Sequence, residues 1–413
     1  MNRRKFIAQT VGGGLAASGG GLIWGETQAP QVPADVKIKI IGIEPLLIRA
    51  ARDYPAWTWV RIRTDQGLEG LGEGFAWTHG APGRVKRIVR YIEQLSDPLA
   101  GTSPLQVQSF VNKAMAQRPL HKLEWGAAIS AIEIAMWDLV GQVAGLPIHG
   151  LLGGAVRKRI PLYANAAVFR KGYGTPDPDE GFDVERILAM KAAGFPIFKW
   201  DPFRIGGNPG EKAIRQQVEQ VARVREAVGD DYQLAIDAHQ RFDLEGAKMV
   251  ARALEPLNIL FFEEPVGFDR PDWFKALSEA TSIPLATGEN STHRKEVAPF
   301  LETGGLSYFQ PEVGTNGGIL ESYKIAAMCE PFGIQIAPHD WCGPIVSRAA
   351  MHVSAAIPNL AYQEWAAVGP RNVEEQDLLD PPVSIEQGHL LVSDSPGLGC
   401  RLNEKLVKAR RLN

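Results

Sequence analysis

The spacing of apolar and polar residues divides the chain into two parts that follow different patterns. In residues 36–41 and 57–63, apolar and polar side chains alternate, which is typical of half-buried β-strands. Apolar residues then recur at helical spacing in the segments 85–95, 104–115 and 127–143. A sheet followed by helices predicts an α+β domain over residues 36–158.

From residue 159 the pattern changes to short apolar runs, each followed by an amphipathic stretch. Eight runs are present, at 160–165, 197–201, 233–239, 259–264, 284–289, 308–312, 335–339 and 360–364. Eight strand–helix units in succession predict a parallel α/β barrel over residues 159–366. The alternative is an open doubly wound sheet, which needs a glycine-rich dinucleotide loop after its first strand. The glycine-rich stretch 206–210 follows the second run and does not match that loop.

Composition narrows the class of protein. A chain of 413 residues can hold one barrel and a smaller domain, and the mostly polar segment 367–413 is expected to pack back on the first domain. The net charge of −3 comes without a basic stripe, so we expect no nucleic-acid partner. No long apolar run follows residue 30, so we expect no membrane contact by the mature chain. Cys329, Cys342 and Cys400 lack the spacing of a zinc site or a disulfide framework.

Residues 1–29 differ from the rest of the chain. Arg3 and Arg4 precede a weakly apolar, glycine-rich stretch that contains no acidic residue before Glu26. This pattern resembles a twin-arginine export signal, with residues 27–29 as a loose cleavage site. We therefore expect export to the periplasm by the twin-arginine route, which carries folded proteins. The alternative is a disordered N-terminus on a cytoplasmic protein.

Three acidic residues lie at the C-terminal ends of neighbouring predicted strands. Asp237, Glu263 and Glu289 are separated by two equal intervals of 26 residues. In a parallel barrel these strand ends meet at the mouth, where active sites lie. Three carboxylates would repel one another there unless a cation joined them, and an all-oxygen site favours magnesium. The alternative is that surface carboxylates share this spacing by chance.

These motifs are similar to those of a known family. Asp237, Glu263-Glu264-Pro265 and Gly288-Glu289-Asn290 resemble the enolase superfamily, specifically its mandelate racemase group. Segments 131–138, 150–154 and 396–399 also match, so the resemblance covers nearly the whole mature chain. It implies a modified (β/α)7β TIM-like barrel with an N-terminal α+β capping domain, and one Mg2+ per subunit on Asp237, Glu263 and Glu289. Glu264 is expected to point away from that site, and we expect a homo-oligomer.

The resemblance also implies a reaction. Members of the family remove the α-proton of a carboxylate substrate, and bound magnesium stabilises the enediolate that forms. The matching base is His339, which the family pairs with an aspartate on the sixth strand. Glu312 stands at that position here, and a glutamate can also hold the imidazole and stabilise its charged form.

Other residues indicate which reaction of the family this is. His239 lies two residues after Asp237, on the same side of the strand, where it can protonate a departing hydroxyl. This pattern resembles galactonate-type acid-sugar dehydratases. Racemases of the group have Lys-x-Lys on the second strand, whereas Lys199-Trp200-Asp201 leaves Lys199 to neutralise the substrate carboxylate and lacks the second lysine. Glu364 resembles the dehydratase glutamate that hydrogen-bonds the substrate.

A final group of residues is expected to contact the sugar acid. Its members are Asp201, Asn165, Asn290, Trp341 and His79. For Asn165 and Asn290, capping of strands is an equally good interpretation. Loops of the capping domain close over the substrate in this family, which assigns the segments 49–57 and 75–84 as lids.

These observations together predict a magnesium-dependent acid-sugar dehydratase. His339 takes the α-proton, His239 assists loss of the β-hydroxyl, and a 2-keto-3-deoxy acid results. An alternative is a sugar-acid cycloisomerase, or an epimerase with Asp201 or His239 as second base. The three evenly spaced acids and the His–Glu pair disfavour a two-carboxylate glycoside hydrolase. A sugar-acid binding protein without activity is disfavoured because the base and the metal ligands are all present.

Overall fold

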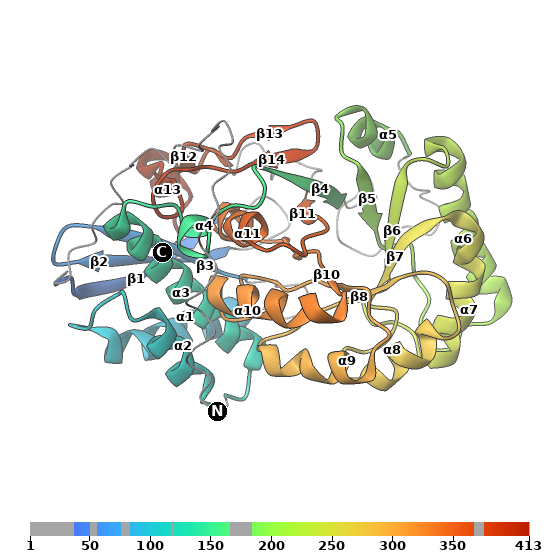
Figure 1. Ribbon diagram of the computed structural model, residues 1–413, viewed down its shortest axis with the longest axis horizontal. Coiled ribbons are helices and arrows are strands. Elements are labelled where there is room, and N and C mark those ends of the chain that lie inside the picture. The colour runs from blue at the N-terminus through green and yellow to red at the C-terminus, as the bar shows by residue number, and fades with distance from the viewer. Residues whose placement is uncertain are drawn as a thin grey trace, which may run out of the picture.

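The computed structural model describes residues 37–49, 56–75, 83–117, 119–165, 184–366 and 376–412 (Figure 1). The predicted export signal, residues 1–29, lies outside these residues, so it stays a prediction. The first part of the described chain is a small sheet with helices, and the second part is a barrel.

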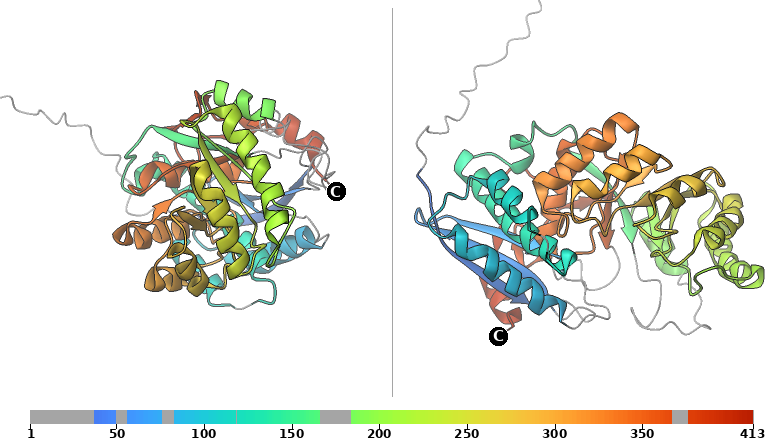
Figure 2. Two further views of the ribbon diagram at one scale, coloured as in Figure 1. Left: turned by 90° about the vertical axis from the view of Figure 1, so that its right-hand side faces the viewer. Right: turned by 90° about the horizontal axis from the view of Figure 1, so that it is seen from below.

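The first part has a three-stranded antiparallel sheet. Its strands are β1 (Ile40–Ile48), β2 (Trp57–Thr64) and β3 (Glu69–Gly74), in that order. The helices that follow are α1 (Arg84–Ser96), η1 (Asp97–Leu99), α2 (Val107–Met115), α3 (Lys122–Ala144) and α4 (Ile148–Leu151). Helices α1 to α3 lie on one face of the sheet (Figure 2). The predicted α+β capping domain is thereby confirmed.

Helix α3 is the core of this domain. It packs so closely on β3 that a Cβ atom at Gly72 would lie only 1.8 Å from the Ala131 carbonyl oxygen, so this position requires glycine. By length and composition α3 could cross a membrane, but 78% of its most apolar 18-residue window is buried inside the fold. The sequence showed no such run because Glu124, Glu133 and Asp138 interrupt the apolar residues. All three of these acids are buried.

The second part is a closed barrel of parallel strands, as predicted. The strands are β4 (Arg159–Asn165), β5 (Ile197–Trp200), β6 (Gln233–Asp237), β7 (Ile259–Glu263), β8 (Leu285–Thr287), β9 (Tyr308–Phe309), β10 (Gln335–Ile336) and β11 (Gln363–Ala366). Neighbours in sequence pair from β4 to β10. The ring closes because β11 pairs with β4, and Ile336 of β10 bridges Leu360 just before β11. The later strands are shorter than the predicted runs because the chain leaves the sheet to form the loops of the barrel mouth.

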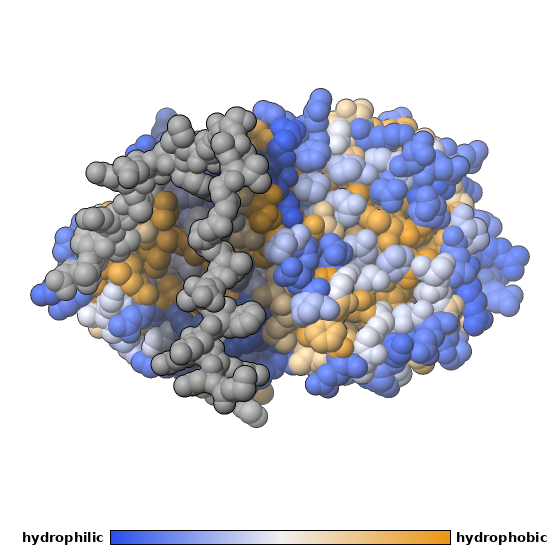
Figure 3. Space-filling view, viewed as in Figure 1, coloured by the Kyte–Doolittle hydropathy of each residue, from blue (hydrophilic) through white to orange (hydrophobic). Residues whose placement is uncertain are grey.

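Helices surround the barrel (Figures 1 and 2). They are α5 (Val184–Ala192), α6 (Glu211–Val228), α7 (Leu244–Leu254), η2 (Glu255–Leu257), α8 (Pro271–Ser278), η3 (Arg294–Glu296), α9 (Ala298–Thr303), α10 (Ile319–Cys329), η4 (Glu330–Phe332) and α11 (Pro344–Ala356). Each amphipathic helix turns apolar residues inward, as α6 does with Ile214, Val221 and Val224. On the outer face shown in Figure 3, polar and apolar side chains are interspersed.

The C-terminal segment contacts both parts of the molecule. It contains β12 (Leu379–Asp380), β13 (Ile385–Glu386), β14 (His389–Leu391), β15 (Arg401–Leu402) and α13 (Glu404–Arg410). Strand β14 pairs antiparallel with β4 of the barrel. At the other end, Arg411 bridges Ile48 of β1 and forms an ion pair with Glu44.

Two buried acidic residues of the capping domain form hydrogen bonds with helices of the barrel. Glu73 of β3 accepts hydrogen bonds from the backbone N–H groups of Gly343, Ile345 and Val346 at the start of α11. Glu133 of α3 does the same for Ile319 and Leu320 at the start of α10. A carboxylate at a helix N-terminus satisfies N–H groups that the helix itself leaves unpaired. These contacts hold the capping domain against the loops that follow β9 and β10.

Candidate active site

Three acidic side chains meet at the mouth of the barrel. Asp237 ends β6, its register partner Glu263 ends β7, and Glu289 lies two residues beyond β8. One oxygen from each carboxylate lies within 4.8 Å of the others, and all three residues are buried. Burial raises the pKa of Asp237, and it raises the pKa of Glu263 to about 8 although Lys199 acts in the opposite direction. This donor set of buried carboxylates fits a hard divalent cation such as Mg2+.

Lys199 lies among these acids. Its Nζ is 2.7 and 2.8 Å from the two oxygens of Glu263, 3.2 Å from Glu364 and 3.7 Å from Asp237. Burial alone would lower the pKa of this lysine, but the charges of Glu263 and Glu364 hold it well above its usual range. The ammonium group of Lys199 thus balances carboxylates of the protein, and its predicted contact with the substrate carboxylate stays a prediction.

His339 and Glu312 form a buried pair behind the acidic cluster. The His339 Nδ1 is 2.7 Å from Glu312 Oε2, and the other oxygen of Glu312 accepts a hydrogen bond from the Gly314 N–H at 2.7 Å. Both carboxylate oxygens therefore have partners, which shows how the longer glutamate fits in place of an aspartate. The opposite ring nitrogen, Nε2, lies 3.3 Å from Glu289. Burial disfavours the charged ring, but Glu364, Glu289 and the bond to Glu312 raise the pKa of His339 well above its usual value.

Glu364 on β11 lies close to both Lys199 and His339. One of its oxygens accepts a hydrogen bond from the Asn165 amide on β4, and the other accepts one from the Asp340 N–H. Burial would raise the pKa of Glu364, but the charges of Lys199 and His339 lower it to about 2. Asn165 thus has a partner inside the protein, and its contact with a substrate stays a prediction.

His239 faces the cluster from a turn after β6. Its Nε2 lies 3.4 Å from Asp237 Oδ2, and its Nδ1 lies 2.9 Å from Asp201 Oδ2. Arg241 binds the same oxygen of Asp201 through two nitrogens, at 2.6 and 3.0 Å. Burial lowers the pKa of His239, but the Asp237 charge and the hydrogen bond to Asp201 outweigh it and raise the value to about 10. The structure therefore pairs Asp201, a predicted substrate contact, with a histidine of the site.

Asn290 and Glu264 lie beside the three clustered carboxylates. The Asn290 amide donates to Glu289 at 3.0 Å and to Glu264 at 3.2 Å, and Gln240 donates to Glu264 at 2.9 Å. Burial and the charges of Glu289 and Asp237 raise the pKa of Glu264 well above its usual value. Glu264 has a φ of +40°, so the regular alternation of the strand ends there. Glu264 is not one of the three carboxylates that converge, and the direction predicted for it stays a prediction.

Two aromatic residues border the site. The Phe75 ring, at the end of β3 in the capping domain, meets the His339 ring edge-on at 5.8 Å between centroids. Trp341 follows His339 by two residues and is buried. His79 and most of the two predicted lid segments lie outside the described residues, so their roles stay predictions.

Sequence reasoning missed three residues of this region. Gln310 donates a hydrogen bond to Glu263, and its position two residues before Glu312 in the same predicted strand, 308–312, was a usable signal. Phe75 comes from the capping domain, and no motif connects it to the barrel. Arg241 was also missed because His239 and Gln240 adopt positive φ angles, which no spacing rule reveals.

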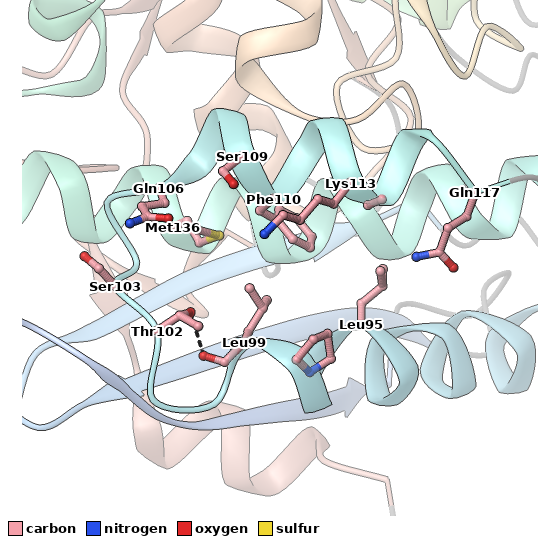
Figure 4. A pocket seen from close by; sticks show the side chains of 12 residues that line it. Leu95, Leu99, Thr102, Ser103, Gln106, Ser109, Phe110, Lys113, Gln117 and Met136 are labelled. Atoms are coloured by element: carbon pink, nitrogen blue, oxygen red, sulfur yellow. Dashed lines mark hydrogen bonds between the residues drawn. The ribbon is translucent and has the colours of Figure 1, made fainter.

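A separate cavity of about 110 Å3 lies in the capping domain (Figure 4). It is lined by residues of α1, η1, α2 and α3, among them Leu99, Phe110 and Met136. Among the described residues, none of the predicted site residues lines it. The barrel mouth is therefore where the predicted chemistry gathers.

Comparison with known proteins assigns both parts of the chain to one family. Residues 47–153 match the N-terminal domain of mandelate racemase / muconate lactonizing enzyme, and residues 183–406 match the enolase C-terminal domain-like family. The chain is 32% identical over 368 residues to a D-galactonate dehydratase from Pectobacterium atrosepticum, covering 87% of this chain and 92% of the relative.

Solved structures agree with this result. A member of the enolase superfamily from Salmonella Typhimurium has a TM-score of 0.82 at 28% identity, over 91% of this chain and 99% of that one. The 3,6-anhydro-D-galactonate cycloisomerase from Zobellia galactanivorans has a TM-score of 0.79 at 26% identity, over 91% of this chain and 100% of that one. The chain belongs to the enolase superfamily, in its mandelate racemase group.

Proposed function

We propose that this enzyme is a magnesium-dependent dehydratase that converts a galactonate-like sugar acid to a 2-keto-3-deoxy acid. One observation carries the proposal: two histidines, each held at Nδ1 by a carboxylate, present Nε2 to the same carboxylate cluster. His339 reaches Glu289 at 3.3 Å, and His239 reaches Asp237 at 3.4 Å. Dehydration needs such a pair, because one group removes a proton and another protonates the departing hydroxyl.

Asp237, Glu263 and Glu289 would hold the cation. A bound Mg2+ would supply positive charge to the substrate carboxylate and stabilise the negative charge that develops as the α-proton leaves. Lys199 already balances part of the cluster from behind, at 2.7 Å from Glu263. The three converging carboxylates at the barrel mouth support the proposal of one divalent ion that also binds the substrate carboxylate.

The protein groups divide the proton transfers between them. His339 Nε2 accepts the α-proton, and Glu312 stabilises the imidazolium at Nδ1, 2.7 Å away. His239 donates a proton to the β-hydroxyl, so that the C–O bond breaks and water leaves. Glu364, whose low pKa keeps it ionised, accepts hydrogen bonds from the substrate or its intermediate.

A cycloisomerase is the second candidate, because a structural relative has that activity by name. Both reactions begin with loss of the α-proton, and they differ in whether the leaving oxygen departs as water or stays in the molecule. An epimerase with Asp201 as second base is less favoured, since Asp201 is bound to His239, Arg241 and the Phe203 N–H.

The test is a screen of aldonic and uronic acids with magnesium, followed by proton exchange in deuterated water. We expect a semicarbazide-reactive 2-keto product and no C2 epimer from the true substrate. His339→Asn should abolish both turnover and α-proton exchange, whereas His239→Asn should block water loss and retain exchange. Formation of an isomer without water loss would support the cycloisomerase, and a deuterated C2 epimer would show that two bases operate.

A further inference from the structure

Asp201 is bound on both oxygens by groups of the protein. It follows β5, and its Oδ1 accepts a hydrogen bond from the Phe203 N–H at 2.8 Å. Its Oδ2 meets His239 Nδ1 at 2.9 Å and two nitrogens of Arg241 at 2.6 and 3.0 Å. Three of the four contacts fall on Oδ2, so this oxygen is held by His239 and Arg241 rather than left for a substrate. Because Asp201 contacts His239 directly, we expect Asp201 to act by orienting that histidine.

The backbone at His239 is held in an unusual conformation. His239 and Gln240 have φ angles of +46° and +58°, which are unfavourable in residues other than glycine. Hydrogen bonds hold this turn: the His239 N–H donates to Asp237 Oδ1 at 2.9 Å, and the Gln240 N–H donates to the Glu264 carbonyl at 2.7 Å. The turn directs the ring so that Nδ1 meets Asp201 while Nε2 meets the metal ligand Asp237.

The glycine-rich stretch after β5 joins the two loops that carry these residues. The Gly207 N–H donates to the Arg241 carbonyl at 2.8 Å, and the Asp243 N–H donates to the Gly207 carbonyl at 3.1 Å. A Cβ atom at Gly206 would lie 2.8 Å from the Arg241 carbonyl oxygen. This close approach fixes Arg241, and hence Asp201, relative to the turn that carries His239.

We propose that Asp201 and Arg241 are positioning residues that lock the His239 ring with its proton-donating Nε2 toward the leaving hydroxyl. The inference rests on the proposed dehydration and assigns it two further residues. Asp201 accepts a hydrogen bond from His239 Nδ1–H, and the two bonds from Arg241 keep Asp201 Oδ2 in place. In this arrangement Asp201 takes no part as a second base.

The elimination step breaks the C–H bond at the α-carbon and the C–O bond at the β-carbon, and it forms one carbon–carbon double bond and one molecule of water. His339 has taken the α-proton, and the electron pair left on the α-carbon forms the carbon–carbon double bond as the C–O bond to the β-carbon breaks. The Nε2 proton of His239 joins the leaving oxygen, and water departs. The Nδ1 proton stays between His239 and Asp201, so the ring returns to a single neutral tautomer.

The decisive variant is Asp201→Asn in the full chain with magnesium. Positioned general acids contribute about 10²–10⁴-fold, so we expect kcat for dehydration to fall at least about tenfold with KM nearly unchanged. The rate of α-proton exchange in deuterated water should stay within about twofold of the wild type, because exchange depends on His339. Arg241→Met should behave like Asp201→Asn, and Arg241→Lys should restore part of the loss. Asp230→Asn, at an exposed aspartate before β6, is the matched control.

A second readout does not depend on activity. In 15N-histidine-labelled enzyme, long-range 1H–15N spectra should show a proton fixed on His239 Nδ1, assigned by its loss in His239→Asn. Asp201→Asn should move that signal and leave the His339 signals unchanged. The inference is overturned if Asp201→Asn dehydrates at the wild-type rate, loses exchange in proportion to dehydration, or leaves the His239 signal in place. If the wild type dehydrates no sugar acid, the proposed function fails, and the spectra still decide whether Asp201 positions the ring.

Discussion

Replacing Lys199 by methionine tests whether the carboxylates at the barrel mouth act as one electrostatic unit. The side chain of Lys199 is 1% exposed, and its Nζ contacts Glu263, Glu364 and Asp237 at 2.7, 3.2 and 3.7 Å. Methionine keeps most of the volume and removes the charge. The variant leaves these acids buried without their cationic partner, so its effect on stability should be large.

The expected magnitude follows from the burial of the pair. Removing one partner of a buried ion pair costs about 3–5 kcal/mol, because the remaining charge is left uncompensated. For domains of about 150–250 residues, 1 kcal/mol corresponds to about 2–4 °C in Tm, so we expect a fall of about 6–20 °C in the presence of EDTA. The fall should be smaller at about pH 6 than at about pH 9, because burial raises the pKa of Glu263 and a protonated Glu263 needs no cation.

Thermal unfolding followed by circular dichroism, with EDTA and then with rising magnesium, measures this effect. Magnesium should raise Tm more in Lys199→Met than in the wild type, because the ion and the ammonium group compensate the same carboxylates. Lys275→Met is the control, since Lys275 forms an exposed pair with Glu279 on the outer helix α8. A Tm within about 2 °C of the wild type in EDTA, or equal magnesium shifts in both proteins, would refute the reasoning.

Three further predictions concern Glu289 of the carboxylate cluster, Glu133 of the capping domain and the N-terminal segment. Glu289→Gln should respond to magnesium with a much smaller rise in Tm than the wild type, because one of three ligands loses its charge; an equal rise would place the ion elsewhere. Burial raises the pKa of Glu133 to about 8, so the stability that this group contributes should decline as the pH rises from about 4.5 to about 8. Glu133→Gln should flatten that part of the curve of Tm against pH, and an unchanged curve would assign the dependence to other groups. The mature protein should begin near Pro30, and its export should require Arg3 and Arg4. Cell fractionation and N-terminal sequencing measure this. A cytoplasmic protein that retains Met1 would contradict the prediction.

The cluster of three carboxylates could be predicted from the sequence because, in a parallel barrel, the spacing of residues along the chain determines which strand ends they occupy. Each strand–helix unit returns the chain to the same rim, so Asp237, Glu263 and Glu289, at two intervals of 26 residues, end on one side of the sheet. The same rule placed His339 and Glu312 at neighbouring strand ends. For these residues, knowledge of strand order was enough to predict proximity.

The contacts that depend on side-chain direction were not accessible in this way. The contact of the Lys199 ammonium group with Glu263, at 2.7 Å, was not predicted, and its contact with a substrate carboxylate stays a prediction. The pairing of Asp201 with His239 depends on two consecutive residues with positive φ, and a periodic pattern contains no signal for them. Strand periodicity therefore indicates which residues reach the mouth, and local backbone geometry decides what each one contacts there.

The different exposure of the two histidines supports their assignment to opposite roles. Both rings have a carboxylate at Nδ1 and a cluster carboxylate near Nε2, so hydrogen bonding alone does not distinguish the base from the acid. The His339 side chain is 6% exposed and lies against Phe75 and Glu364, whereas the His239 side chain is 24% exposed. A group that protonates a leaving hydroxyl must regain a proton from solvent in every turnover, which suits the more accessible ring. The less exposed His339 ring, which must still exchange the abstracted proton with solvent, is better placed to remove a proton from carbon, because partial exclusion of water strengthens its interaction with Glu312 and the developing charge.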